Sequence, residues 1–112
     1  MKNNPHYIKV VLDKDAKIVD LECTLRDVAL DTAGMIGKNW FDTFIETSDK
    51  EEVLKIFSDI FKNQTKKWKT FENDIKISDR NHKFIDFTNE IFSKDGEKYI
   101  VSFGVEHIDN FL

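Results

Sequence analysis

The clearest pattern of apolar and polar positions lies between residues 37 and 63, and its second half predicts an amphipathic helix. Ser48 stands where an N-cap is expected and Glu51 follows three residues later, so each side chain can accept a hydrogen bond from the other residue's backbone N–H. The apolar residues that follow recur at the spacing of one helical face: Val53, Leu54, Phe57, Ile60 and Phe61. Such a helix needs an apolar surface to pack against.

The residues after this helix alternate between apolar and polar, as antiparallel strands do. Strands are predicted over residues 67–77, 83–93 and 98–108, with a type I′ hairpin turn at Asp95-Gly96 between the last two. One face of the first strand carries Phe71, Asn73, Ile75 and Ile77. In the second strand, one face carries Ile85, Phe87, Asn89 and Ile91, and the other carries Phe84, Asp86, Thr88, Glu90 and Phe92.

The N-terminal part of the chain predicts a hairpin followed by irregular helical segments. Strands are expected over residues 7–12 and 17–22, with a turn at residues 13–16 between them. One or two short helices are expected between residues 23 and 35, and a short apolar turn at residues 40–45 precedes the capped helix. Five strands with helices covering one face make an α+β domain.

Composition and charge narrow the possible functions. A chain of 112 residues with 40% hydrophobic residues has room for one domain and one core. Ten phenylalanines indicate either a bulky aromatic core or a cavity lined by rings. The net charge of −4 argues against nucleic acid as the main partner, and the lysines between residues 62 and 69 are interpreted as a solvated helix end.

No pattern of catalytic or metal-binding residues stands out. No Cys/His spacing suits zinc, and Gly34 and Gly37 lack the third glycine and the strand–helix context of a phosphate loop. The carboxylates of the long helix fall on its solvated face, so no acid–base pair is singled out. The single cysteine, Cys23, and the absence of a signal-peptide pattern or an apolar membrane span fit a cytoplasmic protein with no membrane contact.

From Tyr7 to Asp109 the chain resembles a PAS domain. The resemblance is carried by residues 37–42 (GKNWFD), 71–73 (FEN) and 94–97 (KDGE), and by the spacing from Ile18 to Gly37. Residues 1–6 are then a leader or linker, residues 7–109 the PAS domain, and residues 110–112 the start of a C-terminal linker. The closing Asp-Ile-Thr of the family stands here as His107-Ile108-Asp109, which the resemblance assigns to signal output.

The resemblance implies a bacterial sensory module of the PAS-like α+β fold, which holds a small ligand or partner between the long helix and the sheet. A change of occupancy would pass to an output domain in the same chain, of the histidine kinase or diguanylate cyclase type. The residues expected to line the ligand site are Leu25, Met35, Trp40, Phe44, Phe57, Phe61, Phe71, Asn73, Phe87, Asn89 and Ile91. Asn73 and Asn89 are polar on otherwise apolar strand faces and are the candidates to orient a small apolar or aromatic ligand.

Which cofactor the domain would hold, if any, is left open. Flavin photosensors of the family need a cysteine where Trp40 stands, which argues against a covalent flavin adduct, and the long helix holds no axial histidine for haem. His6, His82 and His107 are interpreted as surface residues and Cys23 as a small buried hydrophobe.

Three alternatives remain open from the residues alone. The asparagines could belong to a filled core and bond only to backbone or water. The domain could be a ligand-free interaction module that forms a homodimer through its sheet or flanking helices, with Phe84, Phe92 and Ile100 on the exposed partner face. A small α+β enzyme without assigned catalytic residues is the third.

Overall fold

Five antiparallel strands form one sheet in a computed structural model of the chain, which describes residues 6–25, 28–45, 47–63, 69–78 and 81–106. Within these ranges the side chains of residues 47, 60–63, 69–74, 76–78, 81 and 82 are not described. Most of the predicted leader, the predicted output residues His107, Ile108 and Asp109, and residues 110–112 therefore lie outside the described residues.

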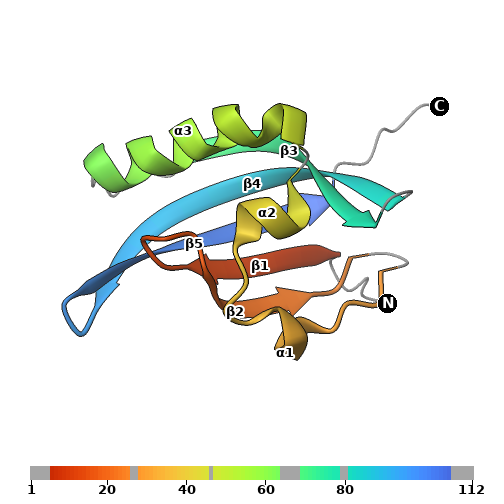
Figure 1. Ribbon diagram of the computed structural model, residues 1–112, viewed down its shortest axis with the longest axis horizontal. Coiled ribbons are helices and arrows are strands. Elements are labelled where there is room, and N and C mark those ends of the chain that lie inside the picture. The colour runs from red at the N-terminus through yellow and green to blue at the C-terminus, as the bar shows by residue number, and fades with distance from the viewer. Residues whose placement is uncertain (1–5, 26–27, 46, 64–68, 79–80, 107–112) are drawn as a thin grey trace, which may run out of the picture.

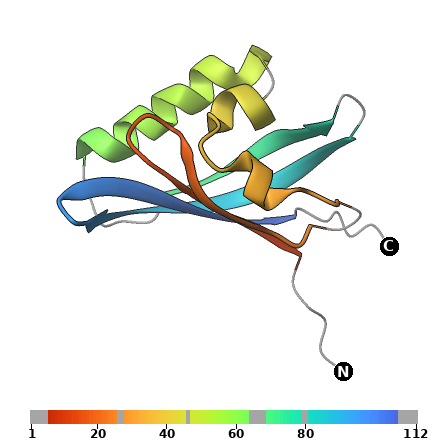
Figure 2. The same cartoon turned by 60° about the horizontal axis from the view of Figure 1, so that its bottom comes forward.

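The elements follow the predicted order. They are β1 (Tyr7–Leu12), β2 (Ile18–Cys23), α1 (Thr32–Met35), α2 (Trp40–Phe44), α3 (Thr47–Asn63), β3 (Lys69–Ser78), β4 (Asn81–Lys94) and β5 (Glu97–Glu106). In the sheet the order is β2-β1-β5-β4-β3, so the first and last strands meet in the middle. Figures 1 and 2 show the three helices on one face of a curved sheet. The predicted α+β fold is confirmed.

The turn between β1 and β2 is fastened to the start of α2. Asp13 Oδ1 accepts hydrogen bonds from the backbone N–H groups of Asp15 and Lys17, at 2.9 Å each. Ala16 is buried with a φ of 63°, and its carbonyl accepts the Trp40 N–H at 2.9 Å. The start of α2 is capped by Asn39, whose Oδ1 accepts the Asp42 N–H at 3.0 Å. These bonds fix where α2 lies over the sheet.

The long helix differs from its predicted form in two respects. It begins at Thr47, so Ser48 lies inside its first turn and is not the N-cap. Leu54 is 42% exposed, whereas Val53 is buried and Phe57 packs against the core. Ile56 was not assigned to the apolar stripe, yet it is half-buried and faces a cavity under α3 beside Val53 and Phe57, whereas Leu54 does not. The side chains of Ile60 and Phe61 lie outside the described part of the chain.

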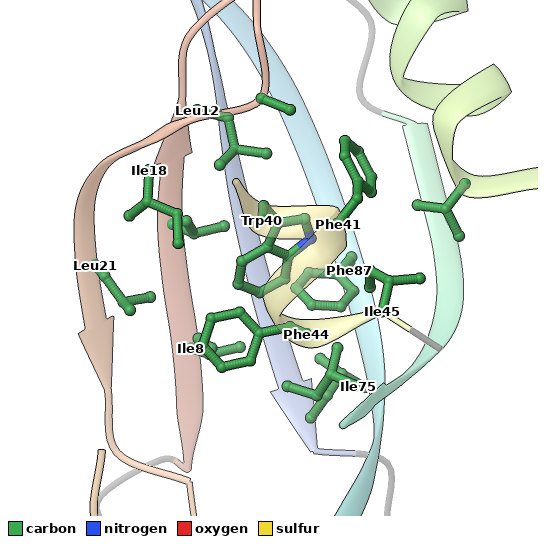
Figure 3. Close-up of a cluster of buried hydrophobic side chains, with 14 of the residues drawn as sticks. Ile8, Leu12, Ile18, Leu21, Trp40, Phe41, Phe44, Ile45, Ile75 and Phe87 are labelled. Atoms are coloured by element: carbon green, nitrogen blue, oxygen red, sulfur yellow. The ribbon is translucent and has the colours of Figure 1, made fainter. Parts of the chain in front are cut away.

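The core lies between the helices and the inner face of the sheet. Alternate residues of β1 are buried, and Phe44 of α2 lies over them (Figure 3). Each of the five strands contributes a buried isoleucine to this core. The predicted exposure of Ile100 is wrong: it is 1% exposed, because the alternation of β5 places residues 100, 102 and 104 on the inner face. Its partners across the sheet are Ile91 on β4 and Leu12 on β1.

The β4–β5 hairpin turns as predicted. Asp95 and Gly96 have φ values of 53° and 81°, and a type I′ turn requires two such positive values. This turn pairs Phe87 with Gly104. A Cβ added at Gly104 would overlap a methyl carbon of Ile85 and stand 2.8 Å from two carbons of the Phe87 ring. The missing side chain of Gly104 therefore lets both side chains pack close against β5.

Substituting Gly104 by alanine tests this close contact. We expect Gly104→Ala to lower the free energy of unfolding by about 1–3 kcal/mol, because the new methyl group must displace the Phe87 ring. The loss is measured by urea denaturation, and near-UV circular dichroism should report a changed Trp40 environment, since Trp40 contacts Phe87. Gly96→Ala is the control: it strains the turn but meets nothing within 4 Å, so the tryptophan signal should stay unchanged. Equal spectra for both variants would contradict this account of Gly104.

Candidate functional site

A small cavity lies between the inner face of the sheet and the helices α2 and α3. Its volume is about 20 Å³, room for about one water molecule. Among the described residues, the lining comes from five elements and includes Leu12, Trp40, Phe41, Val53, Ile56, Phe57, Asn89, Ile100 and Ser102. Two of these residues are polar and none is charged, so the cavity offers hydrogen bonds in an otherwise apolar setting.

The two polar residues form a pair across the sheet. Asn89 on β4 lies directly opposite Ser102 on β5, and the Ser102 hydroxyl donates a hydrogen bond to Asn89 Oδ1. The two residues are only 3% and 8% exposed. This bond lowers the cost of burying both groups, and it holds the amide and the hydroxyl at the cavity wall.

Aromatic rings make up the helix side of the cavity and its surroundings. Figure 3 shows the Trp40 ring near the rings of Phe44 and Phe87. The ring centroids of Trp40 and Phe44 are 4.8 Å apart, and Trp40 meets Phe87 edge-on with centroids 6.2 Å apart. The Phe57 ring of α3 meets the Phe41 ring of α2 edge-on, with centroids 5.3 Å apart. The edge-on arrangement of the Trp40–Phe87 and Phe41–Phe57 pairs is a favourable geometry for aromatic rings. The contact between α2 and α3 beside the cavity therefore includes a ring pair, next to the aliphatic side chains of Val53 and Ile56.

The architecture that surrounds this cavity is found in solved structures of PAS domains. The RpfR quorum-sensing receptor PAS domain of Cronobacter turicensis, in complex with BDSF, matches with a TM-score of 0.75 and 18% identity over 96% of this chain and 100% of that one. The same domain in complex with C12:0 matches with a TM-score of 0.77, 16% identity and the same coverage. The PAS domain of an HTR-like protein from Haloarcula marismortui has a TM-score of 0.73 and 19% identity over 94% of this chain and 84% of its own.

The chain has the PAS fold. No family model matches the sequence, and no curated protein matches it significantly. At identities below 20% the likeness to these structures establishes the fold, and the chemistry of the site is argued from this chain's own residues.

The PAS fold brings together only part of the ligand site expected from the sequence. Trp40, Phe57 and Asn89 line the cavity, while Phe44 and Phe87 pack beside Trp40. The other expected residues do not line it: Ile91 is half-buried on the face of Asn89, Leu25 is buried in the core, and Met35 packs against the core from α1.

Three of the expected residues have undescribed side chains. These are Phe61, Phe71 and Asn73. The strand register nevertheless pairs Phe71 with Phe87 and Asn73 with Ile85. Because Phe87 and Ile85 are buried on the inner face, both β3 residues occupy inner-face positions of the strand. Whether they reach the cavity stays a prediction.

Ser102 is the functional candidate that sequence reasoning missed, although a signal for it was present. Asn89 lies six residues before Asp95, and Ser102 lies six residues after Gly96. In a two-residue hairpin, residues equally far from the turn face each other, so the predicted turn already pairs the two. Five more residues line the cavity that were predicted only as parts of a strand, a turn or the long helix, or on the opposite face: Leu12, Phe41, Val53, Ile56 and Ile100.

The outer face of the sheet carries a second group of aromatic side chains. Tyr7 stacks on Phe103 with ring centroids 5.2 Å apart, and Phe92 stacks on Tyr99 at 5.5 Å. The Tyr7 hydroxyl donates to Glu22 Oε1 at 3.0 Å. This hydrogen bond, together with the negative charge of Glu22, raises the pKa of Tyr7 above its ordinary value of 10.0.

The described histidine, cysteine and acidic side chains are dispersed over the domain. No group of three or more His, Cys, Asp or Glu side chains gathers among them, and His6 Nδ1 lies 3.0 Å from the Thr24 carbonyl oxygen. Cys23 is half-buried against the core. Within the described ranges, no helix is long and apolar enough to pass through a membrane.

The Asn89–Ser102 bond is open to a direct test by a double-mutant cycle. We expect the single variants Asn89→Ala and Ser102→Ala to be coupled by about 0.5–1.5 kcal/mol in unfolding free energy, since each removes one partner of the same buried hydrogen bond. Urea denaturation of both single variants and the double variant measures this coupling. A parallel cycle with Asn89→Ala and the exposed Ser93→Ala should be additive. Additive effects in the first cycle would show that the two side chains do not depend on each other.

Proposed function

We propose that this chain is a sensory PAS domain that binds a small ligand between α2–α3 and the inner face of the sheet. The observation that carries the proposal is the neutral polar pair Asn89–Ser102 on the wall of an apolar cavity. A core that serves stability alone needs no hydrogen-bonding group there, whereas a ligand needs a few such groups to be oriented. Two similar PAS structures hold small molecules, namely BDSF and C12:0, which supports the assignment to this class.

Ligand binding would require α3 to move. The cavity of about 20 Å³ is far smaller than the ~300–1,000 Å³ of typical ligand sites. Among the described residues, α3 is held to the rest by the buried Val53, by half-buried Ile56 and Phe57, and by an ion pair from Lys50 to Asp42 whose side chains are 35% and 63% exposed. A ligand that binds better under a raised helix would shift the domain towards that packing.

The path to the output domain would run along β5. Ser102 lines the cavity, and the strand leads four residues further to Glu106, directly before the expected output residues His107, Ile108 and Asp109. On the inner face the Lys83 amino group lies 3.4 Å from Glu106 Oε2, so the end of β5 is linked to β4. We propose that the output domain is a histidine kinase or diguanylate cyclase of a bacterial cytoplasmic signalling protein.

Native mass spectrometry of freshly purified protein tests ligand binding. We expect a species heavier than the 13.2 kDa chain that loses its extra mass when the protein is unfolded. Asn89→Leu should lose this species, because the head group of the ligand would face an apolar side chain, while the exposed Ser93→Ala should keep it. A bare chain that no small molecule in a broad thermal-shift panel stabilises would contradict the sensory proposal.

An interaction surface is the second candidate function, and the outer face supplies the observation for it. Phe84, Phe92, Phe103 and Val105 are 46%, 38%, 41% and 40% exposed on β4 and β5. Large apolar side chains gathered on one face are typical of contact surfaces. Of the three residues expected on the partner face, Phe84 and Phe92 lie on this surface. Ile100 lies on the inner face.

The oligomeric state tests the outer face. If this face forms a homodimer, Phe103→Lys should convert a dimer into a monomer in light scattering coupled to gel filtration, because a buried charge without a partner opposes association. Ile36→Lys is the matched control, since Ile36 is 48% exposed and lies at the end of α1. A monomeric wild-type protein at all concentrations, or a dimer that survives Phe103→Lys, would contradict the homodimer.

A further inference from the structure

A groove of about 520 Å³ opens between the β1–β2 turn and α3, outside the small cavity. It is lined from three sides by Lys14, Asp15, Ala16, Asn39, Leu54, Phe57 and Ser58. In Figures 1 and 2 the turn between β1 and β2 reaches towards α3. The volume of this groove falls in the range of small-molecule sites, which the inner cavity does not reach.

The two walls of the groove are held in different ways. The turn wall is fixed by backbone bonds, since the Trp40 N–H donates to the Ala16 carbonyl at 2.9 Å and Asn39 Nδ2 donates to the Asp15 carbonyl at 3.4 Å. The α3 wall is fixed by side chains of Val53 and its neighbours. A ligand in the groove would therefore meet one rigid wall and one that can move.

Phe57 belongs to both spaces. Its half-buried ring lines the inner cavity on one side and the groove on the other. Its edge-on contact with Phe41 keeps the ring in its place between them. A rotation of this ring, or a small shift of α3, would join the two spaces into one site that runs from Asn89 to the protein surface.

We propose that the groove is the outer half of the ligand site and that the ligand is an uncharged amphiphile with a slender apolar body. Its hydroxyl, amide or carbonyl head bonds to Asn89 and Ser102, and its body passes Phe57 and lies along Leu54. This inference rests on the sensory function proposed above, and it adds the class of ligand and the place of its tail.

The charges around the two spaces support a neutral head group. Among the described residues no charged side chain lines the inner cavity, so a buried carboxylate or ammonium head would find no counter-ion in that lining. At the groove Lys14 and Asp15 carry opposite charges side by side, so the mouth as a whole favours neither sign. A ligand site made of the inner cavity and the groove also accounts for Leu54. This residue is 42% exposed on the otherwise polar side of α3 and lines the groove.

A series of straight-chain alcohols tests the proposal by NMR titration of the wild-type protein. We expect the dissociation constant to fall by about fourfold per added methylene from 1-hexanol to 1-decanol, because each methylene is buried against the groove. Asn89→Leu should raise the dissociation constant of every alcohol at least tenfold. Leu54→Asp should raise the dissociation constant of 1-decanol at least tenfold and that of 1-hexanol little, because only the longer alkyl chain reaches Leu54.

Control variants separate these effects from changes in the fold. Ile36→Asp introduces the same charge at another exposed apolar residue and should leave all the dissociation constants unchanged. Phe57→Leu keeps an apolar residue in α3 but removes the ring that separates the inner cavity from the groove. It should therefore lower the dissociation constant of 1-decanol more than that of 1-hexanol. Circular dichroism melts of every variant establish that the domain is folded.

Three results would overturn the inference. If Leu54→Asp left the dissociation constant of 1-decanol unchanged, the apolar body of the ligand would not lie along Leu54. Tighter binding of octanoate than of 1-octanol, lost in Lys14→Ala, would place a charged head at the mouth. Failure of every alcohol to bind, while another small molecule is found in the native mass spectrum, would refute this ligand class and leave the sensory function intact. If no small molecule of any kind binds, the sensory proposal itself fails.

Discussion

The register of the β4–β5 hairpin is the constraint on which the site depends. The two-residue turn at Asp95-Gly96 pairs Asn89 with Ser102 and Phe87 with Gly104. The first pair supplies the polar group of the cavity, and the second lets the Phe87 ring lie under Trp40. If β5 slipped by one residue along β4, Ser102 and Gly104 would turn to the outer face, because side chains alternate along a strand. The cavity is therefore a consequence of the turn as much as of the residues that line it.

The helical cover is fixed at one end and loosely held at the other. Asn39 caps α2, and the Ala16 carbonyl accepts the first N–H of that helix, so Trp40 and Phe44 are placed by backbone geometry. By contrast, α3 rests on the core through Val53, Ile56 and Phe57 in the described part of the helix. An element held by a few side chains can take a second position when a ligand supplies new contacts. The same sheet can then be rigid in its register and responsive in its cover.

Much of this fold could be predicted from local chemistry, and the errors have physical causes. The strand at residues 7–12, the Asp95-Gly96 turn and the α+β class follow from alternation and turn residues, and the structure confirms them. Ile100 was placed on the wrong face because β5 is apolar on both faces near it, so hydrophobicity alone does not tell inside from outside. Leu54 was assigned to the core because a helical stripe is wider than the surface that covers it.

The candidate site was harder to predict than the fold, because its lining comes from five elements. Asn89 was identified because a polar residue interrupts an apolar strand face. Ser102 was missed because a serine in the last strand carries no signal until the register is considered. Ile56 was missed although it stands three residues after Val53 on the same helical face, and Leu12 continues the alternation of β1. Neither local pattern tells that the two residues meet at one cavity. Sequence patterns find single unusual residues, whereas a cavity depends on how distant elements meet.

Amide hydrogen exchange with and without 1-octanol tests most directly whether a ligand binds under α3 and fixes the position of this helix over the sheet. The account predicts that the ligand slows amide exchange in α3 around Val53 and Phe57. The amides that pair β4 with β5 should change little, because they are already hydrogen-bonded between the strands without ligand. Equal exchange of α3 in both conditions, or new protection confined to the outer-face residues Phe84, Phe92 and Phe103, would contradict it.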